Sequence, residues 1–182
     1  MNRGLSRLLL LLSAALCALP FAAQAQQAAH VHGQVKLDVA VEGPTVVITM
    51  DAPLDNFLGF ERAPRNDAEK KTVDEAVARL RAADTLFAID PAGNCKLGPV
   101  ELRAPVLGLG KADAAAPAAG AHADIDATFA FNCATASAVK FIDVALFTAF
   151  KGPRQIEAQI VSPQGQFKRT LKRPNARLAW GK

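Results

Sequence analysis

The sequence predicts an α+β fold that is mostly antiparallel β, arranged as a sheet or a sandwich, with one long and one short helix. Several stretches alternate apolar and polar residues with a period of two, which is typical of strands with one buried face. Turn sequences such as Glu42-Gly43-Pro44 and Ser162-Pro163-Gln164-Gly165 separate pairs of these stretches. Residues 66–83 carry the clearest helical pattern.

The first 25 residues have the pattern of a secretory signal peptide. A basic start precedes an apolar run at residues 8–19, and Ala23-Gln24-Ala25 is an A-x-A cleavage site. Neither this run nor any later segment is long and apolar enough to span a membrane comfortably. We therefore expect cleavage near Ala25, export to the bacterial periplasm without membrane insertion, and a single domain over residues 26–182.

Regular alternation predicts the principal strands at residues 30–42 and 122–133. The first of these should form a hairpin with residues 45–50. Residues 156–161 and 166–171 should form another hairpin. Shorter strands are expected at residues 86–89, 95–104 and 177–180, and a strand or strand-turn at residues 141–150.

The long helix is predicted from its start signal and its apolar stripe. Asn66 is a good N-cap, and Glu69 stands three residues later as its capping-box partner. The stripe consists of Val73, Ala76, Val77 and Leu80. Residues 135–140 predict a short helical turn. Residues 54–60 are expected to form a loop packed on the core, and residues 108–120 a flexible loop with little to bury.

Cys95 and Cys133 are the two cysteines of the expected mature chain. In an oxidising compartment two cysteines of one domain usually pair. A thiolate metal ligand or a redox pair is the alternative, but the spacing is not C-x-x-C. The sequence therefore favours a structural disulfide.

The charge pattern gives little indication of a nucleic-acid partner. The formal net charge of +4 falls to +2 once Arg3 and Arg7 leave with the signal peptide. A basic cluster near the C-terminus comprises Lys168, Arg169, Lys172, Arg173, Arg177 and Lys182. The chain has no tyrosine and one tryptophan, so base-stacking side chains are scarce and a solvated basic tail is the simpler interpretation.

No catalytic set is recognisable in the sequence. It contains no G-x-S-x-G, no H-E-x-x-H and no phosphate-binding P-loop. Asp51, Asp55 and Glu61 are carboxylates near the loop at residues 54–60, and turn or surface positions explain them most simply. We expect a protein that is not an enzyme.

Histidine placement suggests a metal site. His30 and His32 are two residues apart, so on a strand both imidazoles would point to the same face. His122 and Asp124 repeat this spacing in the other principal strand. If the two strands were neighbours, these four residues would form an N,N,N,O set suited to zinc. The simpler alternative is a frayed terminus followed by a solvated strand face.

Longer stretches resemble a known family. HVHGQVKLDVAVEGPTVVITMDAPLDNFLGFERAP, followed by the capped helix, resembles the opening of the ZrgA-like family of bacterial periplasmic zinc-binding proteins. HADIDATFAFNCA, VKFIDVALFTAF and IVSPQGQ match the second half of that pattern. The resemblance implies a periplasmic zinc-binding protein that assists zinc uptake alongside a zinc ABC importer or its binding protein. It also implies His30, His32 and His122 as zinc ligands, with Asp124 or Glu61 completing the shell.

Two departures from the family pattern bear on zinc capacity. Members usually carry a histidine-rich run in the central loop, whereas this chain has KADAAAPAAGAHAD, in which His122 is the one histidine. Arg62 stands where the family often has histidine. These departures leave two hypotheses. The chain holds a single zinc ion, or it is a metal-free structural or interaction domain that has lost the zinc loop.

Overall fold

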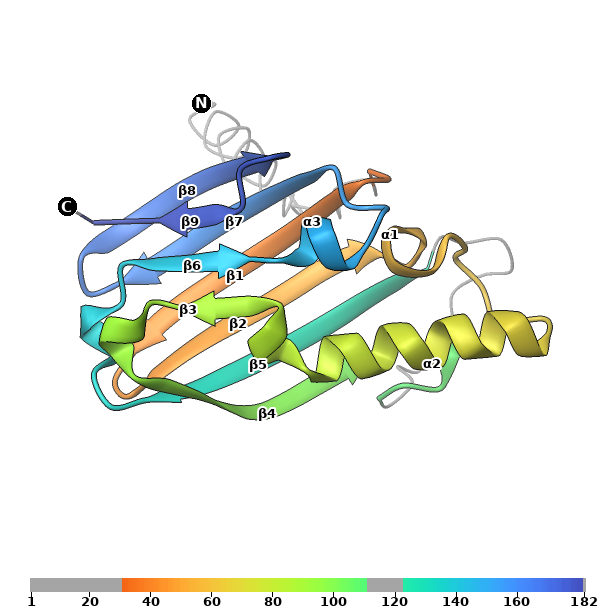
Figure 1. Ribbon diagram of the computed structural model, residues 1–182, viewed down its shortest axis with the longest axis horizontal. Helices are drawn as coiled ribbons and strands as arrows, with labels where there is room; N and C mark the ends of the chain where they lie inside the picture. The colour runs from red at the N-terminus through yellow and green to blue at the C-terminus, as the bar shows by residue number, and fades with distance from the viewer. Residues whose placement is uncertain (1–30, 111–122, 182) are drawn as a thin grey trace, which may run out of the picture.

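The computed structural model describes residues 31–110 and 123–181. Its larger sheet has six strands in the order β4-β5-β2-β1-β7-β8 (Figure 1). Their bounds are β1 Gln34–Glu42, β2 Thr45–Pro53, β4 Cys95–Arg103, β5 Asp124–Cys133, β7 Gln155–Ser162 and β8 Gly165–Lys172. Neighbours in this sheet pair antiparallel, except that β1 and β7 run parallel.

A second layer covers one face of the six-stranded sheet (Figure 1). It contains a three-stranded sheet in the order β3-β6-β9, formed by Phe87–Ile89, Phe141–Val144 and Arg177–Ala179. It also contains α2, which spans Asp67–Arg81. Phe87 of β3 meets Phe129 of β5 with ring centroids 5.0 Å apart, so the two layers share one core.

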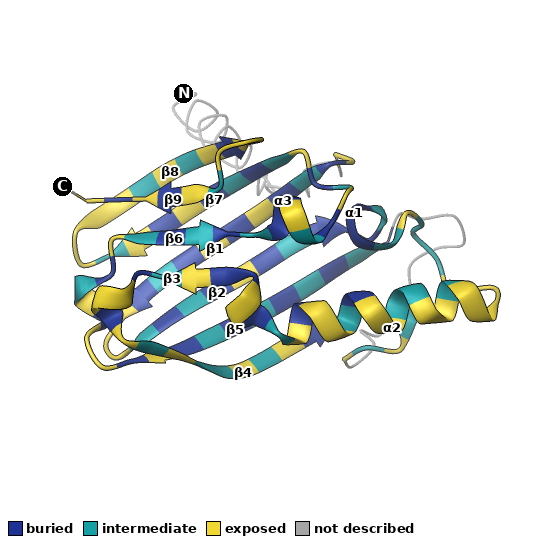
Figure 2. Cartoon of the chain, in the orientation of Figure 1, coloured by how far each residue is buried: buried dark blue, intermediate teal, exposed yellow. Residues whose placement is uncertain are grey.

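Alternation places that core on the covered face of the large sheet. Val35, Leu37, Val39 and Val41 of β1 are buried, whereas the residues between them are half-buried or exposed. The same banding runs along β2, β5 and β7 of the large sheet (Figure 2). A strand with one buried face is what period-two sequences produce.

Short helical segments connect the strands. Two of them are single α-helical turns, α1 at Asp55–Leu58 and α3 at Leu146–Ala149. Phe57 of α1 meets Phe150, just after α3, edge to face at 4.9 Å. Four 3-10 turns lie at Ala83–Thr85, Pro91–Gly93, Pro105–Leu107 and Ala136–Ala138.

The predicted fold class is confirmed, as are the two hairpins β1–β2 and β7–β8. The N-cap of α2 is also confirmed, because the Asn66 side chain accepts a hydrogen bond from the backbone N–H of Glu69 at 2.9 Å. The predicted disulfide joins Cys95 of β4 to Cys133 of β5. Among the described residues, no helix is both long and apolar enough to cross a membrane.

Two local predictions differ from the structure, and one strand pairing is new. Residues 54–60 contain the helical turn α1, since four residues are too few to show a helical period. The first strand begins at Gln34 rather than at residue 30. The parallel pairing of β1 with β7 was not predicted. The expected signal peptide at residues 1–25 and most of the expected flexible loop lie outside the described residues.

Candidate metal centre

The turn before β1 presents His32. The backbone N–H of Gln34 donates to the carbonyl of Val31 at 2.9 Å and closes this turn. Gly33 lies inside it with φ of 84°, a left-handed backbone that glycine adopts without steric cost. The turn therefore fixes where the imidazole of His32 leaves the chain.

The helical turn α1 brings two carboxylates to the same place. Asp55 is its first residue, and the turn ends at Gly59, whose backbone N–H donates to the carbonyl of Asp55. Gly59 has φ of 80°, the left-handed conformation that reverses a chain after a helix. The chain therefore returns toward the start of α1, where Glu61 lies beside His32.

His32 lies between these carboxylates. Its Nδ1 is 3.1 Å from Oδ2 of Asp55, and its Nε2 is 3.1 Å from Oε1 of Glu61. The side chain of His32 is 56% exposed, that of Asp55 25% and that of Glu61 13%. The cluster is thus open to solvent on the imidazole side and enclosed on the Glu61 side, which gives an ion a path of entry.

An ion pair anchors the segment that carries Glu61. The next residue, Arg62, donates from both terminal nitrogens to the carboxylate of Glu69 in α2, at 2.7 and 2.9 Å. The backbone N–H of Arg65 donates to the same carboxylate at 2.7 Å. The Arg62 hydrogen bonds, followed by the one from Arg65, lower the pKa of Glu69 to about 2. α2 therefore serves as the support for this segment.

The three side chains fit a zinc ion. Imidazole nitrogen and carboxylate oxygen are both zinc ligands, and the candidate ligand atoms lie within 4.8 Å of one another. Ligands about 2.1 Å from a tetrahedral zinc are about 3.4 Å apart, so binding requires the widest separation of 4.8 Å to contract by about 1.4 Å. Oδ1 of Asp55 is buried and accepts no hydrogen bond from the described residues, so it can accept a metal.

The imidazole must turn when a metal binds. Its two nitrogens face opposite carboxylates, and one ion can use only one of them. The exposure of His32 allows this rotation. The contacts of His32 with Asp55 and Glu61 join the three side chains in one polar cluster.

The structure brings together two of the predicted ligands, His32 and Glu61, and adds Asp55. Asp124 does not fall within this group of ligand atoms. It lies at the start of β5, opposite Pro53 in register, and Pro53 is two residues before Asp55. The predicted ligands His30 and His122 lie outside the described residues.

Two geometric premises of the predicted site are wrong. His32 lies in a turn before β1, so strand alternation does not place its imidazole. The strands β1 and β5 are not neighbours, because β2 lies between them. The interpretation of Asp55 as a plain turn residue also missed its place in the cluster. Asp55 is six residues before Glu61, a spacing that gives no periodic signal, and the chain reversal at Gly59 brings the two together.

Comparison with known protein families identifies the family of this chain. The family model described as "ZrgA family zinc uptake protein" matches residues 29–180. The chain belongs to this family. The match contains both segments that form the cluster, and it confirms the resemblance noted in the sequence. A search of curated proteins found no match. Membership in the ZrgA family supports a role related to zinc uptake.

Proposed function

We propose that this ZrgA family member is a periplasmic zinc-binding protein that assists zinc uptake. The observation that carries the proposal is the convergence of His32, Asp55 and Glu61 from two segments separated along the chain. These side chains supply one nitrogen and two carboxylate oxygens, a donor set that suits zinc. The role that we propose is binding of the ion rather than catalysis.

The remaining predicted ligands belong to the proposal as additions to this core. Ala123 accepts a hydrogen bond from the backbone N–H of Leu54 at 2.9 Å, so the chain enters β5 next to the start of α1. His122 precedes Ala123 in the sequence, and Asp124 follows it. His30 is two residues before His32. We propose that these residues complete the shell around a single zinc ion.

Calorimetric titration tests the proposal. The mature chain, residues 26–182, is first treated with a chelator and is then titrated with zinc at neutral pH. Asp55→Asn removes one charged ligand, and we expect the dissociation constant to rise about tenfold or more. Asp51→Asn is the matched control, because Asp51 on β2 pairs with Lys36 at 3.4 Å and lies outside the cluster. Unchanged binding in Asp55→Asn, or binding no tighter than the micromolar range in the parent protein, contradicts the assignment.

Histidine variants test the ligands separately. His32→Ala should weaken zinc binding strongly. His30→Ala and His122→Ala report whether the proposed additions contribute. Binding should also weaken in acid, because an imidazole must lose its proton before it can ligate a metal. Wild-type affinity in His32→Ala contradicts its role as a ligand.

The periplasmic location and the importer are further parts of the proposal. The Cys95–Cys133 disulfide and the zinc uptake family support export. A fusion of residues 1–25 to alkaline phosphatase, which is active only after export, tests the signal peptide. If the protein assists a zinc ABC importer, deleting its gene should slow growth under zinc limitation only when that importer is present.

A metal-free interaction domain is the second candidate. The specific observation in its favour is that His32 lies 3.1 Å from a carboxylate oxygen of Asp55 and 3.1 Å from one of Glu61, so the three side chains form polar contacts with one another. The alanine-rich central segment, with its single histidine, points the same way. The calorimetric titration separates the two candidates, because this second function predicts no tight zinc site.

A further inference from the structure

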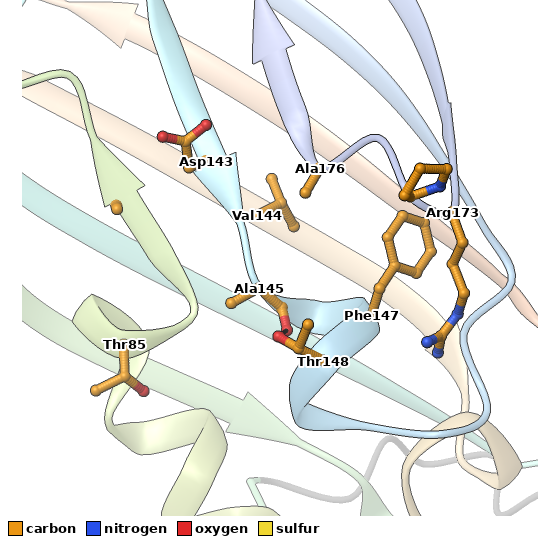
Figure 3. A pocket seen from close by; sticks show the side chains of 10 residues that line it. Thr85, Asp143, Val144, Ala145, Phe147, Thr148, Arg173 and Ala176 are labelled. Carbon is orange, nitrogen blue, oxygen red and sulfur yellow. Dashed lines mark hydrogen bonds between the residues drawn. The ribbon is translucent and has the colours of Figure 1, made fainter.

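A pocket of about 530 Å³ lies where β6 runs into α3, bounded by β3 on one side and the β8–β9 connection on the other (Figure 3). Its surface is mostly apolar and includes Ala88, Val144, Ala145, Phe147, Pro174 and Ala176. Arg173 stands at one rim and Asp143 at the other (Figure 3). The pocket is separate from the residues of the metal centre.

Arg173 is held in place by the protein around it. Its guanidinium lies over the ring of Phe147, 5.4 Å from the centroid. Its Nη2 donates to the backbone carbonyls of Phe150 and Pro153, each at 3.2 Å. A guanidinium has five N–H donors, and Nε and Nη1 of Arg173 donate to nothing among the described residues. These N–H groups are held in place, and a carboxylate oxygen can accept a charge-assisted hydrogen bond from either nitrogen.

The rim of the pocket carries a positive charge without an acidic partner. Arg173 lines the pocket and donates to backbone carbonyls, and it forms no ion pair with a carboxylate among the described residues. Asp143 at the other rim is already paired with Arg177, at 2.6 and 2.8 Å. A ligand that approaches this surface therefore meets uncompensated positive charge around an apolar hollow.

The shape favours a protein segment over a lipid surface. Proteins that enter membranes present protruding apolar side chains, whereas a hollow receives a side chain that protrudes from its partner. Among the described residues, the exposed large apolar side chains are Val31 and Val161, and neither lines this pocket. Fixed arginines stacked on aromatic rings are also typical of protein interfaces.

We propose that this pocket docks an acidic segment of a partner protein. One apolar side chain of the partner enters the pocket, and a neighbouring carboxylate accepts a hydrogen bond from Nε or Nη1 of Arg173. Thr148 lines this pocket and also a second one that reaches Asp55, so the docked partner lies near the metal centre. The proposal concerns protein binding and stands whether or not the protein binds zinc.

A random peptide library displayed on phage tests the proposal when it is selected for binding to the mature protein. We expect enriched peptides to share an aliphatic or aromatic residue next to aspartate or glutamate. The dissociation constant of an enriched synthetic peptide, measured by fluorescence polarisation, should rise with salt, because screening weakens charge attraction. Failure to enrich acidic sequences overturns the proposal.

Substitutions of pocket residues test whether the peptide binds at this pocket. Arg173→Ala should raise the dissociation constant about tenfold or more. Ala88→Trp, at an exposed position of β3, should fill the pocket and block binding without a change of charge. Lys96→Ala on β4, the opposite edge strand, is the control and should bind as the parent does. Wild-type binding by both pocket variants overturns the proposal, even if one of them proves less stable.

Vesicles of phosphatidylglycerol distinguish a lipid surface from a protein segment. We expect the mature protein to show weak vesicle binding that Ala88→Trp leaves unchanged. Strong vesicle binding that depends on Arg173 and competes with the peptide would overturn the protein assignment in favour of anionic lipid.

Discussion

The side-chain amide of Asn56 brackets the backbone at Gly33. Its Oδ1 accepts a hydrogen bond from the backbone N–H of Gly33 at 2.7 Å. Its Nδ2 donates to the backbone carbonyl of the following residue, Gln34, at 2.7 Å. Asn56 is 2% exposed and is the neighbour of Asp55 in α1. This amide therefore fixes the distance between the turn that presents His32 and the helical turn that carries its carboxylate partner.

Removal of this amide should damage both stability and zinc binding. Asn56→Ala loses two buried hydrogen bonds and leaves their backbone partners unpaired, so we expect the free energy of unfolding to fall by about 2–4 kcal/mol. Zinc affinity should fall as well, although no ligand has changed. Urea denaturation and calorimetry measure the two effects. Asn132→Ala, at an exposed position of β5, is the control, and equal behaviour of the two variants would contradict the bracket.

Gly152 supports α1 from the other side. A Cβ added at this position would lie 2.4–2.7 Å from backbone atoms of Asn56, too close without a shift of the backbone. We therefore predict that Gly152→Ala displaces α1, lowers the thermal midpoint and weakens zinc binding.

Gly43→Ala separates displacement of α1 from general strain. Gly43 has φ of 54° in the β1–β2 turn, and nothing lies within 4 Å of its added Cβ. This variant should lose stability through backbone strain but keep its zinc affinity. If Gly152→Ala also keeps full zinc affinity, the close approach of Gly152 to the backbone of Asn56 is not needed to position α1 for zinc binding.

Glu69 should make stability depend on pH in the acid range. Its hydrogen bonds from Arg62 and Arg65 lower its pKa from 4.5 to about 2 in the folded protein. A depressed pKa stabilises the folded state above the unfolded pKa, and this contribution is lost as the pH falls from about 4.5 toward 2. The side chain is partly exposed, at 23%, so salt should reduce the effect.

Glu69→Gln tests this contribution directly. Denaturation of the parent and variant between pH 2 and about 6 should give curves that differ most above pH 4.5 and approach each other at low pH. Asp143→Asn is a useful comparison. Arg177 of β9 likewise lowers the pKa of Asp143, but this pair does not belong to the segment that carries Glu61. A constant difference across the pH range would contradict the pairing with Arg62.

The disulfide should stabilise the fold without shaping the metal centre. Cys95 and Cys133 are 38 residues apart, and a closed loop of this size stabilises the folded state by about 4 kcal/mol in the chain-entropy model. Cys133 ends β5, whereas Asp124 begins it next to the start of α1. A Cys95→Ser, Cys133→Ser protein should unfold at lower urea but, where folded, bind zinc as the parent does. Calorimetry below the unfolding transition checks this.

The sequence predicted the elements whose signals are local. Period-two alternation located the long strands, the capping box located the start of α2, and two cysteines in one domain predicted the disulfide. The parallel pairing of β1 with β7 escaped prediction, because alternation reports which face is buried and not which strand lies alongside.

The metal centre was predicted only in part for the same reason. Histidine spacing drew attention to His32, and the resemblance added Glu61. Asp55 depends on a helical turn of four residues and on the left-handed Gly59, neither of which produces a periodic pattern. Contacts that a chain reversal brings about are tertiary contacts, and no local pattern in a single sequence predicts them.

The place of β1 in the sheet affects how the chain must fold. β1 comes first among the strands yet lies in the interior, between β2 and β7, with Val35 opposite Ile156. One side of β1 thus stays without its partner until nearly the whole chain is available. Such long-range pairing slows folding, and the waiting edge of β1 is open to association with other chains. A chain shortened before Gln155 should therefore aggregate rather than form a smaller version of the domain.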